Sequence, residues 1–223
     1  RALEIGSGTG MIVAAIAPNC DSYVATDFSK AAIDRLGQLC ATHPALSHVT
    51  LKQCAANQLA DFEQDAIDTV ILNSVAQYFP HIDYLVNFLH QAANIIGDKG
   101  HIFLGDLRSL PLLSAYHGSV QLYKAEEDLD LKKLAELVHQ NAEQEEELLI
   151  DPAFFIAIQQ VIPRLSGVRL NLKRGTHRNE LTRFRYDVVL QIGGAVAECE
   201  PKHLDWKNSA LDLAALEQRL EKL

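Results

Sequence analysis

Short apolar runs alternate with longer amphipathic stretches through the first half of the chain. A short run fits a buried strand, and apolar residues three or four apart fit a helix that packs on a sheet. This alternation is typical of β-α-β units and predicts a parallel sheet. The expected strands are Ala2–Ile5, Ser22–Thr26, His48–Lys52, Asp68–Asn73 and His101–Gly105. The expected helices lie near Met11–Ile16, Lys30–Thr42 and Ile82–Ile96.

The second half of the chain has a different pattern. Residues 110–149 are rich in Leu and Glu and are expected to form a helical insertion. Asp151 followed by Pro152 is typical of the start of another helix, with Asp as the cap. Apolar residues then recur at every second position in two segments, which predicts an antiparallel hairpin. The alternating residues are Val168, Leu170 and Leu172, then Phe184, Tyr186, Val188 and Leu190.

These elements predict one α/β domain over residues 1–192. The chain begins inside the first expected strand, so we expect the helices that precede this strand to be missing and the chain to be part of a longer protein. Residues 193–223 are expected to form a linker and an amphipathic tail helix that leads toward a following domain. The apolar positions of this tail are Trp206, Leu211, Leu213, Leu216 and Leu220.

Composition narrows the classes of function. A formal net charge of -9 argues against nucleic-acid binding, which needs a basic surface to neutralise phosphates. No apolar run has membrane-spanning length, and neither the cysteines nor the histidines show metal-ligand spacing. We therefore expect a cytoplasmic protein with no membrane segment and no metal. The most basic stretch, residues 173–185, is expected to be a charged hairpin at a sheet edge, and contact with a phosphorylated group is the alternative.

A glycine-rich turn follows the first expected strand. Gly6, Gly8 and Gly10 allow a tight turn and the close approach of a ligand to the backbone before a helix begins. Asp27 ends the second strand, where its carboxylate can accept hydrogen bonds from both hydroxyls of a ribose. Together these features predict a site for a cofactor that contains adenosine.

The details of the turn favour S-adenosylmethionine (SAM) over a dinucleotide. The spacing is G-x-G-x-G, whereas a dinucleotide loop reads G-x-G-x-x-G and holds a pyrophosphate. SAM carries no phosphate but has an amino group, which Glu4 is expected to bind directly or through water. The product would be S-adenosylhomocysteine (SAH).

Further cofactor contacts are expected along the same edge of the sheet. The loop after the third strand is expected to hold the adenine, and the loop after the fourth strand lies across the topological switch point from the glycine turn. A methyl donor bound at the first strand would point its sulfonium toward that second loop. The expected cofactor-binding residues are Glu4, Gly6, Ser7, Gly8, Gly10, Asp27, Phe28, Ala55, Ala56, Asn57, Asn73, Ser74 and Val75.

Several stretches of the chain match a known family. They are Leu3–Gly10, Val70–Pro80, Gly105–Ser109, Glu146–Phe155 and Asn179–Val188. On these residues, the sequence resembles the methyltransferase domains embedded in nonribosomal peptide synthetases, over nearly its whole length. The resemblance implies the class I SAM-dependent methyltransferase fold, a Rossmann-like α/β fold. Its seven-stranded sheet has strand order 3-2-1-4-5-7-6, and residues 110–149 would form a helical lid.

The resemblance also implies an activity and partners. The domain would methylate an aminoacyl or peptidyl chain held as a thioester on the phosphopantetheine arm of a carrier-protein domain. Methylation of the α-amine is the commonest outcome in the family. The neighbouring domains of the synthetase, adenylation and condensation domains among them, would be the other partners.

Two departures from the family pattern leave alternatives open. Asp27 stands in Thr-Asp-Phe-Ser, where many N-methylating relatives carry Glu-Pro-Ser, so O- and C-methylation remain possible outcomes. Asn57 stands where Asp is more usual, which is expected only to tune cofactor affinity. A catalytically silent scaffold and a nicotinamide-dependent reductase are further alternatives. The intact glycine turn and Asp27 argue against the first, and the glycine spacing argues against the second.

Methyl transfer to an amine requires that the nucleophile be held in line with the donor and that its proton have an acceptor. Asp106, after the fifth strand, is the first candidate for this acceptor, and Arg108 is either a second site residue or its ion-pair partner. Tyr78 is expected to line the amine pocket, with core packing as the alternative. His117 is a candidate base or a structural histidine.

Glu180, which precedes the last expected strand, is a further candidate for the acceptor. It is also expected to form a structural ion pair with Arg183, which is the interpretation we favour for Arg183.

Overall fold

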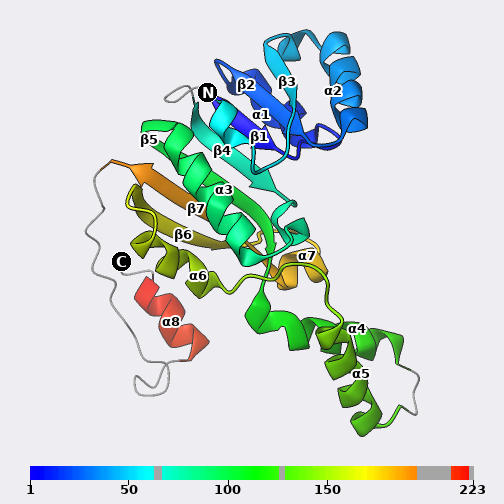
Figure 1. The fold of residues 1–223 in the computed structure, drawn as a ribbon. Coiled ribbons are helices and arrows are strands. Elements are labelled where there is room, and N and C mark those ends of the chain that lie inside the picture. The colour runs from blue at the N-terminus through cyan, green and yellow to red at the C-terminus, as the bar shows by residue number, and fades with distance from the viewer. Residues whose placement is uncertain (63–66, 126–128, 195–211, 221–223) are drawn as a thin grey trace.

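The computed structural model describes residues 1–62, 67–125, 129–194 and 212–220. Figure 1 shows a twisted sheet with helices packed against it. The strands are β1 (Ala2–Ile5), β2 (Tyr23–Asp27), β3 (Val49–Gln53), β4 (Ile67–Asn73), β5 (Ile96–Arg108), β6 (Leu165–Leu172) and β7 (Arg185–Gly193). The helices are α1 (Met11–Ile16), α2 (Lys30–Thr42), α3 (Ile82–Ile95), α4 (Leu113–Lys124), α5 (Leu131–Glu143), α6 (Pro152–Ala157), α7 (Glu180–Arg183) and α8 (Leu213–Leu220).

The seven strands form one sheet in the order β3-β2-β1-β4-β5-β7-β6. The pairs from β3 to β5 are parallel, and β7 runs antiparallel to both β5 and β6. This confirms the predicted α/β fold class and strand order. The bounds of β1 to β4 and of α1 to α3 lie within one residue of prediction. The larger differences are that β5 is longer at both ends and that β7 begins at Arg185, because Phe184 closes the turn of α7 instead.

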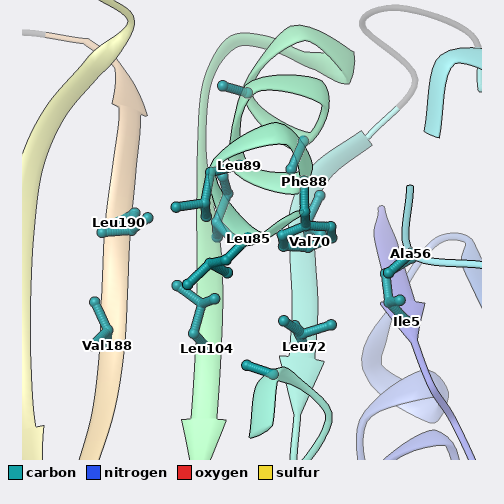
Figure 2. Close-up of a cluster of buried hydrophobic side chains, with 14 of the residues drawn as sticks. Ile5, Ala56, Val70, Leu72, Leu85, Phe88, Leu89, Leu104, Val188 and Leu190 are labelled. Carbon is teal, nitrogen blue, oxygen red and sulfur yellow. The ribbon is translucent and has the colours of Figure 1, made fainter. Parts of the chain in front are cut away.

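Two apolar clusters lie on opposite faces of the sheet, because successive strand residues point to opposite sides. Leu3 and Ile5 of β1 belong to the larger cluster, whereas Ala2 belongs to the smaller one. The larger cluster includes Leu85, Phe88 and Leu89 of α3, which lie over β4 and β5 (Figure 2). The smaller cluster includes residues of α1 and α2. The two clusters fix the sheet between helices and hold the strand ends in place.

The insertion and the tail agree with the predicted elements where the structure describes them. Helices α4 and α5 lie within residues 110–149 and extend beyond the end of the sheet (Figure 1). The Asp151 side chain caps α6 by accepting a hydrogen bond from the Ala153 amide at 2.8 Å. Helix α8 falls in the expected tail, while Trp206 and Leu211 lie outside the described residues. The division of the chain at residue 193 stays a prediction.

Within the described ranges, no helix combines the length and the apolar character that crossing a membrane requires.

Candidate functional site

A cavity of about 560 Å³ opens at the carboxyl ends of β1, β2 and β4. Ligands bind at this edge of open α/β sheets, and sites for small molecules usually enclose about 300–1,000 Å³. The cavity is lined by Ile5, Gly6, Asp27, Phe28, Cys54, Ala55, Ala56, Ser74, Val75, Tyr78, Phe79, Pro80 and Tyr84. Of the predicted cofactor residues, the structure thus brings together Gly6, Asp27, Phe28, Ala55, Ala56, Ser74 and Val75.

The glycine turn places bare backbone at the cavity wall. Gly6 has φ +73°, and a Cβ there would collide with a methyl group of Val75, so this position requires glycine. Gly10 has φ +81° at the start of α1, and a Cβ there would lie 2.5 Å from Leu36 Cδ2. The turn, which joins β1 to α1, therefore packs closely against Val75 in the loop after β4 and against Leu36 of α2.

Asp27 ends β2 with its side chain buried at the cavity wall. Its Oδ2 accepts a hydrogen bond from the Gly8 amide at 3.0 Å, and its Oδ1 accepts one from the Ser29 amide at 2.8 Å. An ionised carboxylate has about four acceptor positions, so about two remain for the hydroxyls of a ligand. Asp27 also holds the glycine turn in position, a role that the sequence spacing does not reveal.

Glu4 lies in β1 but not on the cavity wall. Its side chain is buried, and its Oε2 accepts a hydrogen bond from the Tyr23 hydroxyl at 2.7 Å. Burial raises the pKa of the Glu4 carboxyl, and the bond from Tyr23 only partly opposes this. Burial and the neighbouring Glu4 also raise the pKa of Tyr23. Recognition of a cofactor amino group by Glu4 stays a prediction.

The remaining predicted cofactor residues lie near the cavity without lining it. The Ser7 amide donates to Thr26 O at 2.9 Å, within the glycine turn. Asn73 donates from Nδ2 to Ser74 Oγ at 3.1 Å and so contacts a residue of the wall. Asn57 is exposed in the loop after β3. Direct contacts of Ser7, Gly8, Gly10, Asn57 and Asn73 with a cofactor stay predictions.

Sequence reasoning missed the aromatic side of the cavity. The rings of Phe79 and Tyr84 lie with their centroids 4.6 Å apart, next to Pro80. Phe79 and Pro80 end one of the stretches that match the family, and this position could have indicated that they belong to the site. Tyr84 is in the first turn of α3, and nothing in the sequence pattern there indicates a site. Tyr78 lines the cavity and is 71% exposed, so the alternative of core packing for Tyr78 is wrong.

Asp106 sits at an irregularity in β5, beside the end of β4. The register between β5 and β7 shifts between Leu104 and Leu107, and Asp106 has φ +64°. Ser74, which follows β4, has φ +56° and donates from Oγ to Asp106 Oδ2 at 2.9 Å. Residues other than glycine rarely adopt positive φ, and those that do cluster at functional sites. Ser74 lines the cavity, so the Asp106 carboxylate lies behind the cavity wall, on the far side of Ser74.

Arg185, and not Arg108, is the ion-pair partner of Asp106. Arg185 Nη1 donates to Asp106 Oδ2 at 2.8 Å, and Lys173 Nζ lies 3.8 Å from Oδ1. Both cations belong to the basic stretch 173–185, and their side chains are only 15% and 23% exposed. The predicted charged hairpin at a sheet edge is confirmed, since β6 and β7 form the antiparallel edge of the sheet, but Lys173 and Arg185 direct their charges to Asp106.

The predicted ion pair between Glu180 and Arg183 is also wrong. Glu180 Oε1 lies 3.8 Å from Arg185 Nη2, while the Arg183 guanidinium lies 5.3 Å from the ring centroid of Phe184. Glu180 and Arg183 both belong to the short helix α7, and Arg185 follows at the start of β7. Local spacing therefore suggested the wrong partner for Glu180.

Arg108, at the end of β5, connects the sheet to the insertion. It donates from Nη1 to Glu147 and from Nη2 to Glu145, both at 2.8 Å. Its guanidinium also lies 4.9 Å from the ring centroid of Tyr116 in α4. Burial opposes ionisation of Glu145, but hydrogen bonds from Arg108 and from the Glu147 amide outweigh it and lower the Glu145 pKa.

A second cleft, of about 420 Å³, lies between the insertion and the ends of β5 and β7. It is lined by Arg108, Tyr116, His117, Gln144, Glu145, Glu146, Glu147, Glu180 and Arg185. His117 Nε2 lies 3.3 Å from Glu145 Oε2, outside hydrogen-bonding geometry, and that oxygen already accepts from Arg108. His117 thus belongs to this cleft, Tyr78 to the first cavity, and Asp106 lies between them. Among its described residues, 110–125 and 129–149, the insertion contributes none to the lining of the first cavity, so its role as a lid stays a prediction.

Comparison with known proteins agrees with this geometry. Residues 3–102 match the model of a family described as a methyltransferase domain. Chondramide synthase cmdD of Chondromyces crocatus is 46% identical over 210 residues, which are 94% of this chain and 5% of that protein. Nonribosomal peptide synthetase penN of Penicillium thymicola is 34% identical over 229 residues, which are 99% of this chain and 8% of that protein. The chain therefore spans only a small part of the relatives that it matches.

Solved structures share the fold at low sequence identity. The N-methyltransferase NodS of Bradyrhizobium japonicum WM9 has a TM-score of 0.53 at 14% identity, over 86% of this chain and 85% of that one. The CurJ carbon methyltransferase has a TM-score of 0.57 at 14% identity, over 87% of this chain and 48% of that one. One neighbour is named for nitrogen and the other for carbon, so the fold alone does not select the methylated atom. The matched family, the strand order and the synthetase relatives identify the chain as a class I methyltransferase domain of the kind embedded in nonribosomal peptide synthetases.

Proposed function

We propose that this domain transfers a methyl group from SAM to the α-amine of an aminoacyl or peptidyl chain held as a thioester on a carrier protein. The observation that carries this proposal is the Asp106 carboxylate, bonded to Ser74 in the wall of the first cavity. A carboxylate in this position can accept a hydrogen bond from an amine and so orient its lone pair. The proposal treats the first cavity as the cofactor site.

The residues of the first cavity suit SAM. In this proposal, the free acceptor positions of Asp27 bind two ribose hydroxyls. The small side chains of Ala55 and Ala56, together with Phe79, form an apolar part of the cavity for the adenine. The missing side chain at Gly6 lets the ligand approach the backbone. When bound, SAM supplies a methyl group on a positively charged sulfonium. SAH would occupy the same contacts after transfer.

The charges near Asp106 favour an amine as the acceptor. Four glutamates and two arginines line the second cleft, which gives it a net negative lining while His117 is neutral. A negative cleft raises the local concentration of cationic ligands such as protonated amines. The amine must lose a proton as it gains the methyl group, and in this proposal Asp106 accepts a hydrogen bond from the amine. Tyr78, exposed at the cavity mouth, would form part of the amine pocket.

O- or C-methylation is the second candidate, and the pairing of His117 with Glu145 is the observation that favours it. A hydroxyl or a carbon acid needs stronger assistance from a base than an amine does, and a histidine beside a carboxylate can provide it. His117 lies in the second cleft and not in the cofactor cavity. We therefore rank this candidate below N-methylation.

The named relatives are synthetases of which the matching part is a small fraction. We propose that this domain likewise works beside adenylation and condensation domains in the cytoplasm. A carrier-protein domain would present the acceptor on its phosphopantetheine arm, and the helical insertion would close over it.

One experiment tests the activity. Carrier proteins loaded with a panel of aminoacyl groups are incubated with the domain and SAM, and tandem mass spectrometry locates the added methyl. We expect it on the α-nitrogen; a methyl on oxygen or carbon would establish the second candidate instead. Free amino acids methylated as efficiently as loaded carriers would refute the carrier as partner.

Ligand-induced thermal stabilisation tests the cofactor separately. Because a ligand that binds only the folded state raises its stability, SAM and SAH should raise the melting temperature while NADPH should not. No shift with SAM or SAH would indicate a catalytically silent scaffold.

A further inference from the structure

The β6–β7 hairpin supplies a buried group of charges around Asp106 that the sequence did not reveal. Lys173 at the end of β6, and Arg185 and Asp187 of β7, surround the Asp106 carboxylate and amide. Their side chains are between 15% and 23% exposed. Two cations and two anions are thereby placed together, and the more exposed Glu180 lies at the margin of the group, 3.8 Å from Arg185 Nη2.

The backbone of β5 explains why Asp106 needs such support. Leu104 pairs with Val188 and Leu107 pairs with Tyr186, so two residues of β5 oppose the single residue Asp187. This is a β-bulge, which removes the extra residue from the hydrogen-bond ladder. The Asp106 amide, freed from the ladder, donates instead to Asp187 Oδ1 at 2.8 Å.

Each end of Asp106 is therefore held by a residue of β7. Asp187 holds the backbone amide, and Arg185 holds the carboxylate through Oδ2. Lys173 reinforces Asp187 by donating to the same Oδ1 at 3.0 Å. Positive φ at a residue other than glycine persists only where the surroundings enforce it, and these three side chains are the surroundings.

The arrangement continues to the cofactor cavity. Asp106 Oδ2 accepts hydrogen bonds from both Arg185 and Ser74, and the Ser74 amide donates to Gly105 O at 3.1 Å. Ser74, also at positive φ, lines the cavity. Arg185 is thus connected to the cavity wall through one shared oxygen atom, Asp106 Oδ2.

We propose that Arg185 is a positioning residue for methyl transfer, which holds Asp106 in the orientation that the acceptor requires. This inference rests on the proposed function, in which Asp106 contacts the acceptor amine. Arg185 itself does not line the first cavity. Asp187 and Lys173 serve the same purpose from the backbone side of the bulge.

A double-mutant cycle tests the proposal. Arg185→Met removes the charge at similar length, Arg185→Lys keeps the charge, and Asp106→Asn removes the proposed target. The control is Arg183→Met, an exposed arginine two residues away that contacts Phe184. The assays are kcat and KM for a loaded carrier protein, SAH affinity by calorimetry, and amide hydrogen exchange.

We expect Arg185→Met to lower kcat by about tenfold or more while KM for SAM and SAH affinity change by less than about threefold, as for an interaction needed in the transition state. Arg185→Lys should recover part of this loss. In the Asp106→Asn background, Arg185→Met should have little further effect, because residues in one network are not additive. Exchange of the amides in residues 104–108 should accelerate in Arg185→Met and stay unchanged in Arg183→Met.

Two outcomes would overturn the inference. One is an unchanged kcat in Arg185→Met, and the other is an equal fold loss in both backgrounds, which would show that Arg185 acts independently of Asp106. If Arg185→Met does not fold, the cycle is run with Arg185→Lys, for which the same non-additivity is expected. Full activity of Asp106→Asn alone would instead remove Asp106 from the proposed function, so the two failures are distinguishable.

Discussion

The proposed cofactor site depends most on Asp27, so Asp27→Ala is the sharpest test of it. The carboxylate would lose two charge-assisted hydrogen bonds to the ribose, each worth about 1.5–3 kcal/mol. Part of the loss is recovered by water, and we expect about 2–4 kcal/mol in SAH affinity. This corresponds to about 30- to 1,000-fold, since about 1.4 kcal/mol is tenfold.

The structure adds a second component to this loss. Asp27 accepts hydrogen bonds from the amides of Gly8 and Ser29, so alanine would also remove the acceptor that holds the glycine turn. The turn would then have to be ordered when SAH binds, which places the expected loss in the upper half of that range. Asp27→Asn separates the two components. Its side chain keeps one acceptor oxygen, but its NH₂ group would face one of the two backbone amides, and two donors cannot form a hydrogen bond. We expect Asn to weaken binding nearly as much as Ala does.

Isothermal titration calorimetry with SAH measures the effect, with thermal unfolding as a check that the variants fold. Asp34→Ala is a matched control, because Asp34 is 58% exposed and pairs with Lys30 on the surface of α2. The control should bind SAH as the parent does. Unchanged SAH affinity in folded Asp27→Ala would refute the assignment of the first cavity as the adenosine site.

Three further predictions follow from the same geometry. Asp106→Asn should lower kcat by about 10²–10⁴-fold, the usual worth of general-base assistance, with SAH affinity unchanged by calorimetry. Gly6→Ala should destabilise the fold by about 1–3 kcal/mol in chemical denaturation, because of its positive φ and the contact with Val75. Glu145 has a lowered pKa in the folded protein, so its pair with Arg108 stabilises the fold above the ordinary glutamate pKa of about 4.3 and is lost as the pH falls. Arg108→Met should therefore lower the melting temperature at pH 7 and weaken its dependence on pH between about 5 and 3.

Much of the fold could be predicted because its signals are local. The buried strands β1 and β4 are short apolar runs, and Asp151 with Pro152 marks the start of α6 in two adjacent residues. The glycine turn and Asp27 also belong to one β-α-β unit, whose geometry fixes their relative position. These features need no knowledge of which distant segments meet.

The ion pairs of Asp106 and Arg108 could not be predicted, because they join segments far apart in sequence. Asp106 and Arg185 are 79 residues apart, and Arg108 and Glu145 are 37 apart. Sequence proximity suggested the pairs of Asp106 with Arg108 and of Glu180 with Arg183, and both were wrong. In β5, Arg108 is two residues beyond Asp106, and the bulge at Asp106 breaks the simple alternation that would place both on one face.

In the proposed function, cofactor binding and acceptor binding draw on different parts of the sequence. Residues that line the first cavity come from positions 5–84, within the parallel half of the sheet. Asp106 is oriented by Arg185 and Asp187, from the antiparallel hairpin that follows the insertion. Substitutions in the hairpin can thus change how the acceptor is held while leaving the cofactor contacts intact. Because the Ser74 hydroxyl and the Arg185 guanidinium meet at Asp106 Oδ2, that one oxygen is where the two halves of the site are coupled.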